Sequence, residues 1–339
     1  METKKYHQPF RMKRRLLYIA AAAMLLTAAL TSCKKDEQEQ AIMTMTVTVD
    51  YETYERPMRF YLKGSGTAVI DWGDGLPNDT ITLSATVNTR CQRPNSGETN
   101  RDITIYGDGI TSLECSFNSF NILTVLDVSR NKALKTLKCN NNLLTVLDVS
   151  RNRALTHLEC SSNRLTSLDV SKNTALTELA CNYNRLTSLD VSRNTALTSL
   201  NCSYNQLTVL DVSKNTALTL LSCSNNQLTV LDVRKNIALD ALSCGGNRFT
   251  ALDVSNNIAL EYLSTFGSPL ERLDVSRNTA LKTLWCVRNQ LSVADLDALF
   301  HTLHSNTILG KIVDVTDNPG TDACNPKIAT EKGWIVDTE

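Results

Sequence analysis

Residues 197–217 read LTSLNCSYNQLTVLDVSKNTA, and the same 21-residue unit recurs through the middle of the chain. Cysteine returns at intervals of 21 residues from Cys139 to Cys244, and two further intervals reach Cys286 through Thr265. A row of aspartates keeps the same interval from Asp127 to Asp274. A fixed period of this length predicts a solenoid of stacked coils.

Each unit carries an alternating apolar pattern twice. Leu200 and Cys202 alternate with polar neighbours in the first half, and Leu210 and Val212 do so in the second. Because successive side chains of a strand point to opposite faces, these residues should face inward. We therefore expect two short strands in each coil, and two parallel sheets that face each other across a narrow core.

The two half-units, L-x-x-L-x-C-x-x-N-x-L and L-T-x-L-D-V-S-x-N, resemble the bacterial 21-residue class of leucine-rich repeats and, more loosely, the internalins. The resemblance covers residues 110–291 and implies a mainly β leucine-rich-repeat solenoid. It departs from the helix-bearing type of repeat, because neither half-unit shows a helical period.

Polar residues of the repeat have structural roles. The asparagines that follow each half, such as Asn205 and Asn215, can supply hydrogen-bond partners to backbone groups in buried turns. The cysteines occupy a slot that Leu or Val fills in the other half, so we expect buried free thiols rather than disulfides or a metal array. Basic residues three positions after most of the aspartates suggest a charge-neutralising ladder rather than a cation-binding strip.

The first residues have the pattern of a targeting segment. Basic residues between Lys4 and Arg15 precede the apolar run Leu16–Leu30, which is shorter than the ~20 residues of a membrane span. The following Thr-Ser-Cys33 resembles the lipobox of bacterial lipoproteins, which implies cleavage before Cys33 and acylation of that residue. The alternative is an ordinary secretory signal with a chance cysteine.

We thus expect a signal peptide at 1–32 and a charged tether at 33–40, anchored to the outer membrane through lipid alone. The tether resembles export signals that send such lipoproteins to the cell surface. Residues 1–32 hold six of the 35 basic and one of the 35 acidic residues, which leaves 29 and 34, a net charge of −5. A mildly acidic protein outside the cytoplasm is a poor candidate for nucleic-acid binding.

The two ends of the repeat array need caps, since an end coil exposes its core. Residues 41–109 read as a β-rich domain, in which the turn Asp71–Gly75 resembles that of polycystic-kidney-disease-type β-sandwich modules. Asp71, Asp74 and Asp79 could ligate Ca²⁺ or cap their own turn, and we favour the second. Residues 292–339 read as a small α/β cap, with a helix that begins after Ser292, a strand at 312–315, a helical turn near 324–332 and a strand at 334–336.

Motifs of catalysis are missing from the sequence: it contains no H-E-x-x-H, no P-loop and no G-x-S-x-G. Asp297, His301 and His304 could hold a metal, but a solvated helix face explains them better. We therefore expect no enzyme, no cofactor and no metal site. The sequence instead favours a surface-anchored module that binds a protein or a glycan, and the alternative is a structural envelope or spacer lipoprotein without a specific ligand.

The two sides of the repeat differ in how much their outward positions vary. The Asp side is uniform, whereas the Cys side changes from coil to coil and carries aromatic residues near its C-terminal end. Clustered exposed aromatics are typical of protein contacts and sugar-stacking platforms. We predict a ligand-binding patch of Tyr262, Phe266 and Trp285, which Tyr183 and Tyr204 extend at the rim. The alternative is that the C-terminal cap folds over the patch and buries it.

Overall fold

The computed structural model describes residues 42–49, 57–94, 100–116 and 121–339, all within the compact unit Ala41–Glu339. The predicted signal peptide, Cys33 and the tether lie outside these residues. Within the described ranges, no helix has the length and apolar character that a membrane crossing requires.

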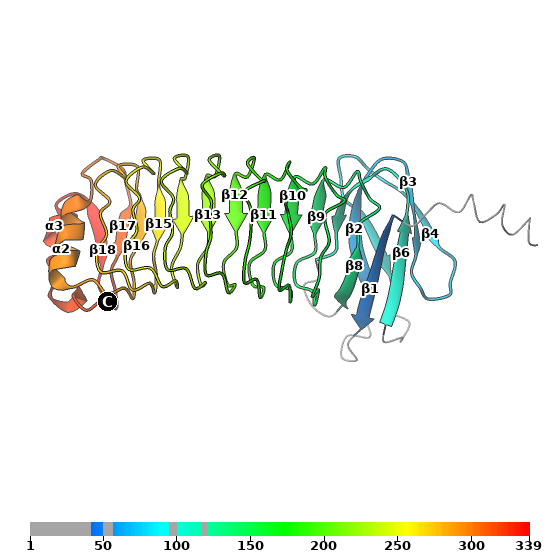
Figure 1. Ribbon diagram of the computed structural model, residues 1–339, viewed down its shortest axis with the longest axis horizontal. Helices are drawn as coiled ribbons and strands as arrows, with labels where there is room; N and C mark the ends of the chain where they lie inside the picture. Colours follow the sequence, from blue (N-terminus) through cyan, green and yellow to red (C-terminus); the bar gives the residue numbers. More distant parts are fainter. Residues whose placement is uncertain (1–41, 50–56, 95–99, 117–120) are drawn as a thin grey trace, which may run out of the picture. The chain divides into compact units, whose positions relative to one another are not determined.

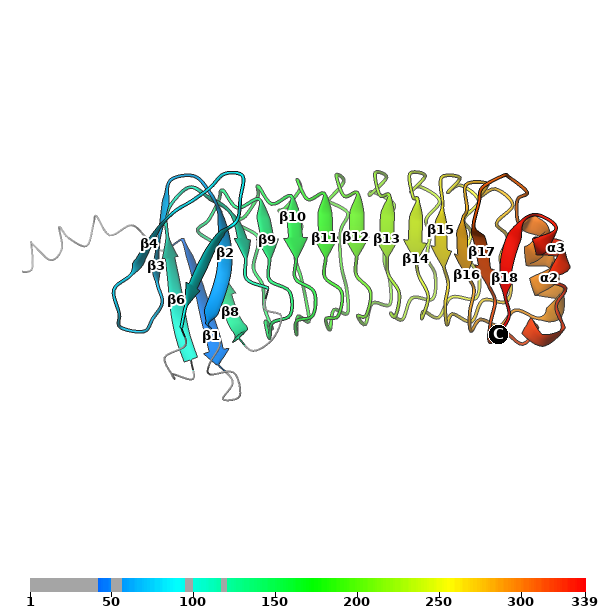
Figure 2. The same cartoon turned by 180° about the vertical axis from the view of Figure 1, so that it is seen from behind.

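The repeats form a stack of coils, each of which contributes one short strand to a parallel sheet (Figures 1 and 2). Each strand pairs in register with the strand 21 residues further on, so that Leu200 faces Leu221 and Leu221 faces Leu242. The strands are β9 (Thr136–Lys138), β10 (His157–Glu159), β11 (Glu178–Ala180), β12 (Ser199–Asn201), β13 (Leu220–Ser222), β14 (Ala241–Ser243), β15 (Tyr262–Ser264) and β16 (Thr283–Trp285).

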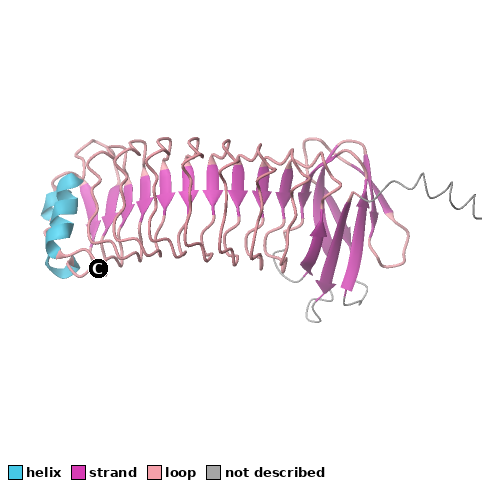
Figure 3. Cartoon of the chain, viewed as in Figure 1, coloured by secondary structure: helices cyan, strands magenta, loops and turns pink. Residues whose placement is uncertain are grey.

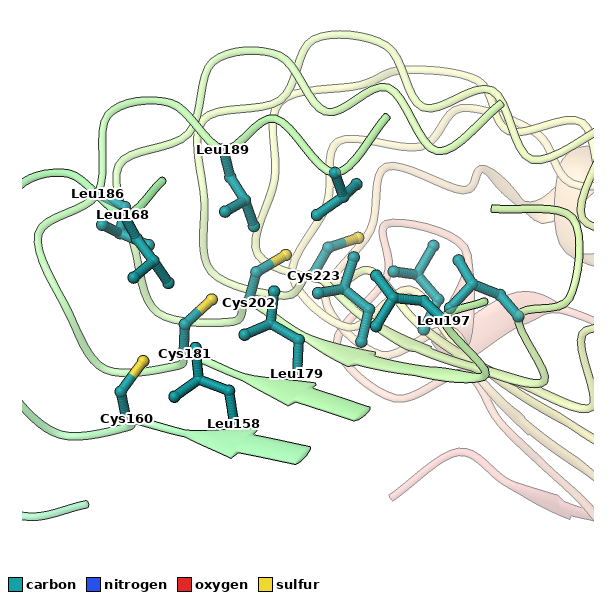
Figure 4. Close-up of a cluster of buried hydrophobic side chains, with 14 of the residues drawn as sticks. Leu158, Cys160, Leu168, Leu179, Cys181, Leu186, Leu189, Leu197, Cys202 and Cys223 are labelled. Atoms are coloured by element: carbon teal, nitrogen blue, oxygen red, sulfur yellow. The ribbon is translucent and has the colours of Figure 1, made fainter. Parts of the chain in front are cut away.

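The predicted inward positions form the core. The central Leu of every coil strand from β9 to β16 is buried, and so is the Cys two residues on, or Thr265 in its place after β15. Figure 4 shows Cys160, Cys181, Cys202 and Cys223 side by side, one from each coil, next to leucines that include Leu158 and Leu179. The mainly β solenoid of stacked coils is therefore confirmed.

The second parallel sheet was wrongly predicted. Leu210 and Val212 are buried as expected, but from residue 128 onward the Asp halves contain no strand and run as loops and turns (Figure 3). Several of their backbone N–H groups bond within the same coil: Ser213 N donates to Asp211 Oδ1 (2.8 Å) and Asn215 N donates to Val212 O (2.9 Å). Such local bonds compete with sheet formation.

Asparagine side chains connect neighbouring coils on the Asp side. The Nδ2 atom of Asn215 donates to Val191 O (3.0 Å) and to Asn194 O (2.8 Å), both in the preceding coil. On the Cys side, Asn205 Nδ2 donates to Cys181 O (3.1 Å) and Cys202 O (3.0 Å). These contacts repeat from coil to coil and confirm that the asparagines serve buried backbone carbonyls.

Two sheets make up the N-terminal part. One has the order β4-β3-β6-β1-β8, and in the other β5, β2 and β7 continue directly into the coil strands through β7–β9 pairing. Since β7 and β8 lie beyond residue 109 yet pair with β2 and β1, the sheets cross the boundary that we predicted there. The strands are β1 (Met43–Val49), β2 (Met58–Gly64), β3 (Thr67–Asp71), β4 (Asp79–Thr82), β5 (Thr89–Arg93), β6 (Asn100–Tyr106), β7 (Ile110–Glu114) and β8 (Asn121–Asp127).

The carboxylates of the Asp71–Gly75 turn have protein partners. Asp71 accepts a hydrogen bond from Gly73 N (2.9 Å), and Asp79 accepts one from Trp72 Nε1 (2.7 Å). The guanidinium of Arg93 pairs with both Asp74 (2.9 Å) and Asp79 (2.8 Å). Burial raises the pKa of Asp74, but the hydrogen bond from Leu76 N (3.1 Å) and then the contacts with Arg93 hold it below its usual value. Asp71 and Asp74 therefore cap the turn through the N–H groups of Gly73 and Leu76, and the guanidinium of Arg93 lies between Asp74 and Asp79.

The C-terminal cap follows the sequence prediction closely. Helix α2 (Val293–Thr302) begins with a capping box between Ser292 and Asp295, and it buries Leu296, Leu299 and Phe300. Strands β17 (Lys311–Asp314) and β18 (Trp334–Asp337) extend the coil sheet, with η2 (Thr321–Ala323) and α3 (Lys327–Thr330) between them. The ammonium group of Lys311 lies under the cap and donates to three carbonyl oxygens, those of His304, Asn306 and Lys332.

Candidate functional site

The outward face of the coil sheet is set by the three-residue strands. In β12 the central Leu200 is buried, and the flanking Ser199 and Asn201 are partly exposed. The same pattern in the neighbouring strands turns one residue before and one residue after each Leu toward solvent. Residues that differ from coil to coil therefore lie together on one surface, which we call the Cys-side face.

Aromatic residues lie on this face near the C-terminal cap. Tyr262 packs edge-on against Trp285, with ring centroids 5.5 Å apart. Phe266 lies in the turn after β15, under the guanidinium of Arg288 at 5.7 Å. Trp285 is 44% exposed and Phe266 is 42% exposed, so the cap does not bury these two residues, and Tyr262 is half-buried.

Tyr183 and Tyr204 form a second aromatic group on the same face. Their rings are stacked, with centroids 4.2 Å apart and planes within 9° of parallel. Both side chains are about half exposed. A hydrogen bond with the Tyr204 hydroxyl raises the pKa of Tyr183, because it favours the protonated phenol. The pair thus presents a flat apolar surface with its hydroxyl groups close together.

The backbone of both tyrosines is in the left-handed region, with φ of 55°. The equivalent position in the other coils, in most of them just before a buried asparagine, has the same conformation and holds Asn, Gly, Ser or Arg: Asn141, Ser162, Asn225, Gly246, Gly267 and Arg288. A large side chain there costs about 1–2 kcal/mol relative to glycine. Because Ser162 and Arg288 share the conformation, the positive φ belongs to the turn of the repeat, and the two exposed tyrosine rings are what distinguishes these two coils.

An open groove of about 490 Å³ connects the two aromatic groups. Tyr183 and Tyr204 line one end, and Phe266 and Trp285 line the other. The floor between them consists of serine and asparagine side chains and of Gly245, from the turns and strands of β11 to β15. The volume is in the range of small-ligand sites, although the groove is shallow.

Gly245 permits the close approach of two coils at this floor. A Cβ atom on Gly245 would lie 2.2 Å from the carbonyl oxygen of Phe266, a distance that no side chain could accommodate without a backbone shift. The neighbouring Gly246 N donates to the same oxygen at 2.6 Å. The two glycines therefore allow the backbone of Phe266 to pack directly against the preceding coil.

The structure places four of the five predicted aromatic residues on one groove. Tyr262 is the exception, because it contacts Trp285 but does not line the groove. The sequence prediction omitted the floor residues, among them Ser222 and Ser243. Their outward position was evident from the strand period, but a small polar residue gives no further sign that it belongs to a site.

The Asp side is uniform, and hydrogen bonds engage its carboxylates. Each described carboxylate of the row from Asp127 to Asp274 accepts a hydrogen bond from the backbone N–H two residues on, at 2.8–3.0 Å. These bonds, together with the side chain two residues on, hold the pKa of Asp190 below its usual value, and Arg193 contributes less. The predicted neutralising ladder is thus a minor influence. In the described part of this row, only Asp232 forms an ion pair, with Arg234.

The cysteines, as predicted, are free and buried throughout the described part of the row. Burial raises the pKa of Cys202 and of Cys286 to about 12, so both remain protonated thiols near neutral pH.

Asp297 and His304, which the sequence offered as metal ligands, do not point to a common site. Asp297 accepts a hydrogen bond from Asn325 N (2.7 Å), whereas His304 lies beyond α2 and bonds to Leu281 O (2.8 Å). In the ranges that the structure covers, no three His, Cys, Asp or Glu side chains are placed to hold a metal.

Two solved structures of bacterial proteins have the same fold. The functional domain of InlJ from Listeria monocytogenes, which includes a cysteine ladder, is 38% identical over 68% of this chain, with a TM-score of 0.60. A leucine-rich-repeat protein of Leptospira interrogans is 25% identical over 62% of the chain, with a TM-score of 0.53.

The chain spans about half the length of these two structures, 48% of the first and 56% of the second. No family model and no curated protein sequence matches it. The coil geometry and these structural neighbours together establish that the chain has the fold of a leucine-rich-repeat solenoid, of the internalin-like kind.

Proposed function

We propose that this protein is a non-catalytic binding module, displayed at a bacterial surface, whose ligand contacts the Cys-side face. The observation that carries the proposal is the group of exposed aromatic side chains on that face. Exposed apolar clusters on a rigid surface mark contact sites, and aromatic residues dominate the energy of such contacts.

The contrast between the two sides of the solenoid supports this assignment. Exposed residues on the Asp side repeat almost unchanged, and their polar groups bond within their own coil. The Cys-side face instead changes at each step and carries two stacked, exposed tyrosines, which stability alone does not require. A spacer protein without a ligand would have no need for this difference.

Display at the surface would come from Cys33. The basic segment, apolar run and lipobox-like Thr-Ser-Cys33 support lipid anchoring, and burial of acyl CH₂ groups would hold the chain to a membrane. The charged residues 34–40 would then act as a tether that separates the folded unit from the bilayer. In this proposal the membrane is contacted through lipid alone, and the ligand is an extracellular protein or glycan.

The function is tested by binding assays on the purified full chain, with a panel of extracellular proteins and glycans as candidate ligands. The triple substitution Tyr262→Ala, Phe266→Ala and Trp285→Ala should reduce binding of any ligand found by at least tenfold. A matched control on the Asp side is Val146→Ala, Val209→Ala and Val230→Ala, which also removes three exposed apolar side chains and should bind normally. Equal loss in both variants, or normal binding by the first, would contradict the proposed face.

A further inference from the structure

The groove between the two aromatic groups crosses the coil strands rather than following one of them. Its lining comes from six successive coils, β11 to β16. Five strand steps of ~4.8 Å give a length of about 24 Å. An occupant of this shape is an extended chain of repeating units, laid across the face with an aromatic platform near each end.

The lining is free of charge. None of its thirteen residues is Asp, Glu, Lys, Arg or His, although charged residues make up 21% of the whole chain. Hydroxyl and amide groups provide the polar surface instead. Among the described residues, nothing forms a hydrogen bond with the side-chain hydroxyls of Ser222, Ser224 and Ser243, which leaves them open to a ligand.

Charged pairs lie on either side of this neutral stretch. Toward the N-terminal side, Lys138 pairs with Glu159 (2.7 Å), and His157 lies 3.4 Å from Glu178. Toward the cap, Arg288 pairs with Asp317 at 2.9 Å. The thirteen lining residues thus form an uncharged stretch with these ion pairs near its two ends, and the Lys282–Glu261 pair lies beside it, just before β15 and β16.

We propose, on the basis of the proposed binding function, that this groove binds a neutral oligosaccharide. The faces of sugar rings can stack on the Tyr183–Tyr204 pair and on Phe266 and Trp285, and their hydroxyl groups can exchange hydrogen bonds with the serine and asparagine floor. An uncharged ligand loses no ionic partner on entering. An acidic glycan would meet no cation among the thirteen lining residues, and the guanidinium of Arg288 beside Phe266 is already paired with Asp317. A protein surface, about a quarter charged, would leave charges unpaired there.

The strained tyrosines make a sharp test possible. In Tyr183→Asn with Tyr204→Asn the rings are removed, but the new residue is the one that occupies the same left-handed position as Asn141 and Asn225. The double variant should therefore melt at the same temperature as the parent chain or higher. Its affinity for the sugar should fall at least tenfold, because the stacking platform is lost.

The experiment is a titration of the full chain with neutral linear oligosaccharides of four to six hexose or N-acetylhexosamine units, beside sialylated and uronic-acid-containing counterparts. Binding of a neutral series and its loss in the stable Asn variant would support the proposal. Preference for the acidic series, or unchanged affinity in the Asn variant, would overturn it. If no glycan binds but a protein ligand is lost in the Tyr262, Phe266 and Trp285 variant, this inference fails while the binding function stands.

Discussion

Replacing Asn215 by Ala should lower the free energy of unfolding by about 1–3 kcal/mol. The side chain is completely buried, and its Nδ2 atom donates to Val191 O (3.0 Å) and Asn194 O (2.8 Å) of the preceding coil. Each of these carbonyls keeps one backbone partner, so the variant loses two hydrogen bonds of about 0.5–1.5 kcal/mol each without creating a fully unpaired oxygen.

The substitution Asn215→Asp sharpens the same prediction. It keeps the size of the side chain but turns the donor into an oxygen that faces two carbonyl oxygens in a buried site. The Oδ1 atom of Asn215 accepts no hydrogen bond from the described residues, so the substitution tests only the hydrogen bonds that Nδ2 donates. Because a buried carboxylate without a donor is costly, the Asp variant should lose more than the Ala variant, about 3 kcal/mol or more.

The assay is equilibrium unfolding in urea, followed by far-ultraviolet circular dichroism, with Thr216→Ala as the control from an exposed position of the same coil. The control should stay within about 0.5 kcal/mol of the parent chain. The reasoning is refuted if Asn215→Ala is as stable as the control, or if Asn215→Asp is no less stable than Asn215→Ala.

Three further outcomes are expected. Cys33→Ala should shift the protein from the membrane fraction to the soluble fraction, and unchanged partitioning on immunoblots would contradict the lipid anchor. Cysteines of the row should resist alkylation at pH 8 until the chain is denatured, because burial keeps Cys202 and its neighbours protonated and inaccessible to the reagent. Rapid labelling of the native protein, detected by mass spectrometry, would contradict their burial. The bonds from Arg234 lower the pKa of Asp232 to about 2, whereas the same carboxyl in the unfolded chain has a pKa near 4. The stability that this carboxylate contributes is therefore present above about pH 4 and should decline as the pH falls toward about 2. A urea midpoint that did not fall over this range would contradict the prediction.

The sequence predicted the buried side chains better than it predicted the backbone. Alternation around Leu200 and Leu210 correctly identified the inward positions of both halves, because burial depends on a local period of two. It did not reveal that Asp211 would take the N–H of Ser213 and leave the second half without a strand. The destination of backbone hydrogen bonds depends on side chains that fit either arrangement.

The sequence identified the aromatic residues of the candidate site but not the backbone conformation of its tyrosines. Trp285 and Phe266 were recognisable because large aromatic side chains break the monotony of the repeat. The conformation of Tyr183 and Tyr204 was hidden, since nothing in a tyrosine indicates a positive φ. The asparagines at positions 141 and 225 and the glycines at positions 246 and 267, which occupy the same slot, gave a signal in the sequence.

The central claim is that the ligand contacts the Cys-side face, and site-specific photo-crosslinking tests it most directly. A photoreactive amino acid would replace Ser222 on the groove floor in one variant and Val209, an exposed residue of the Asp side, in another. With the ligand bound, the account predicts a crosslink from position 222 and none from position 209. A crosslink from position 209 alone would contradict it.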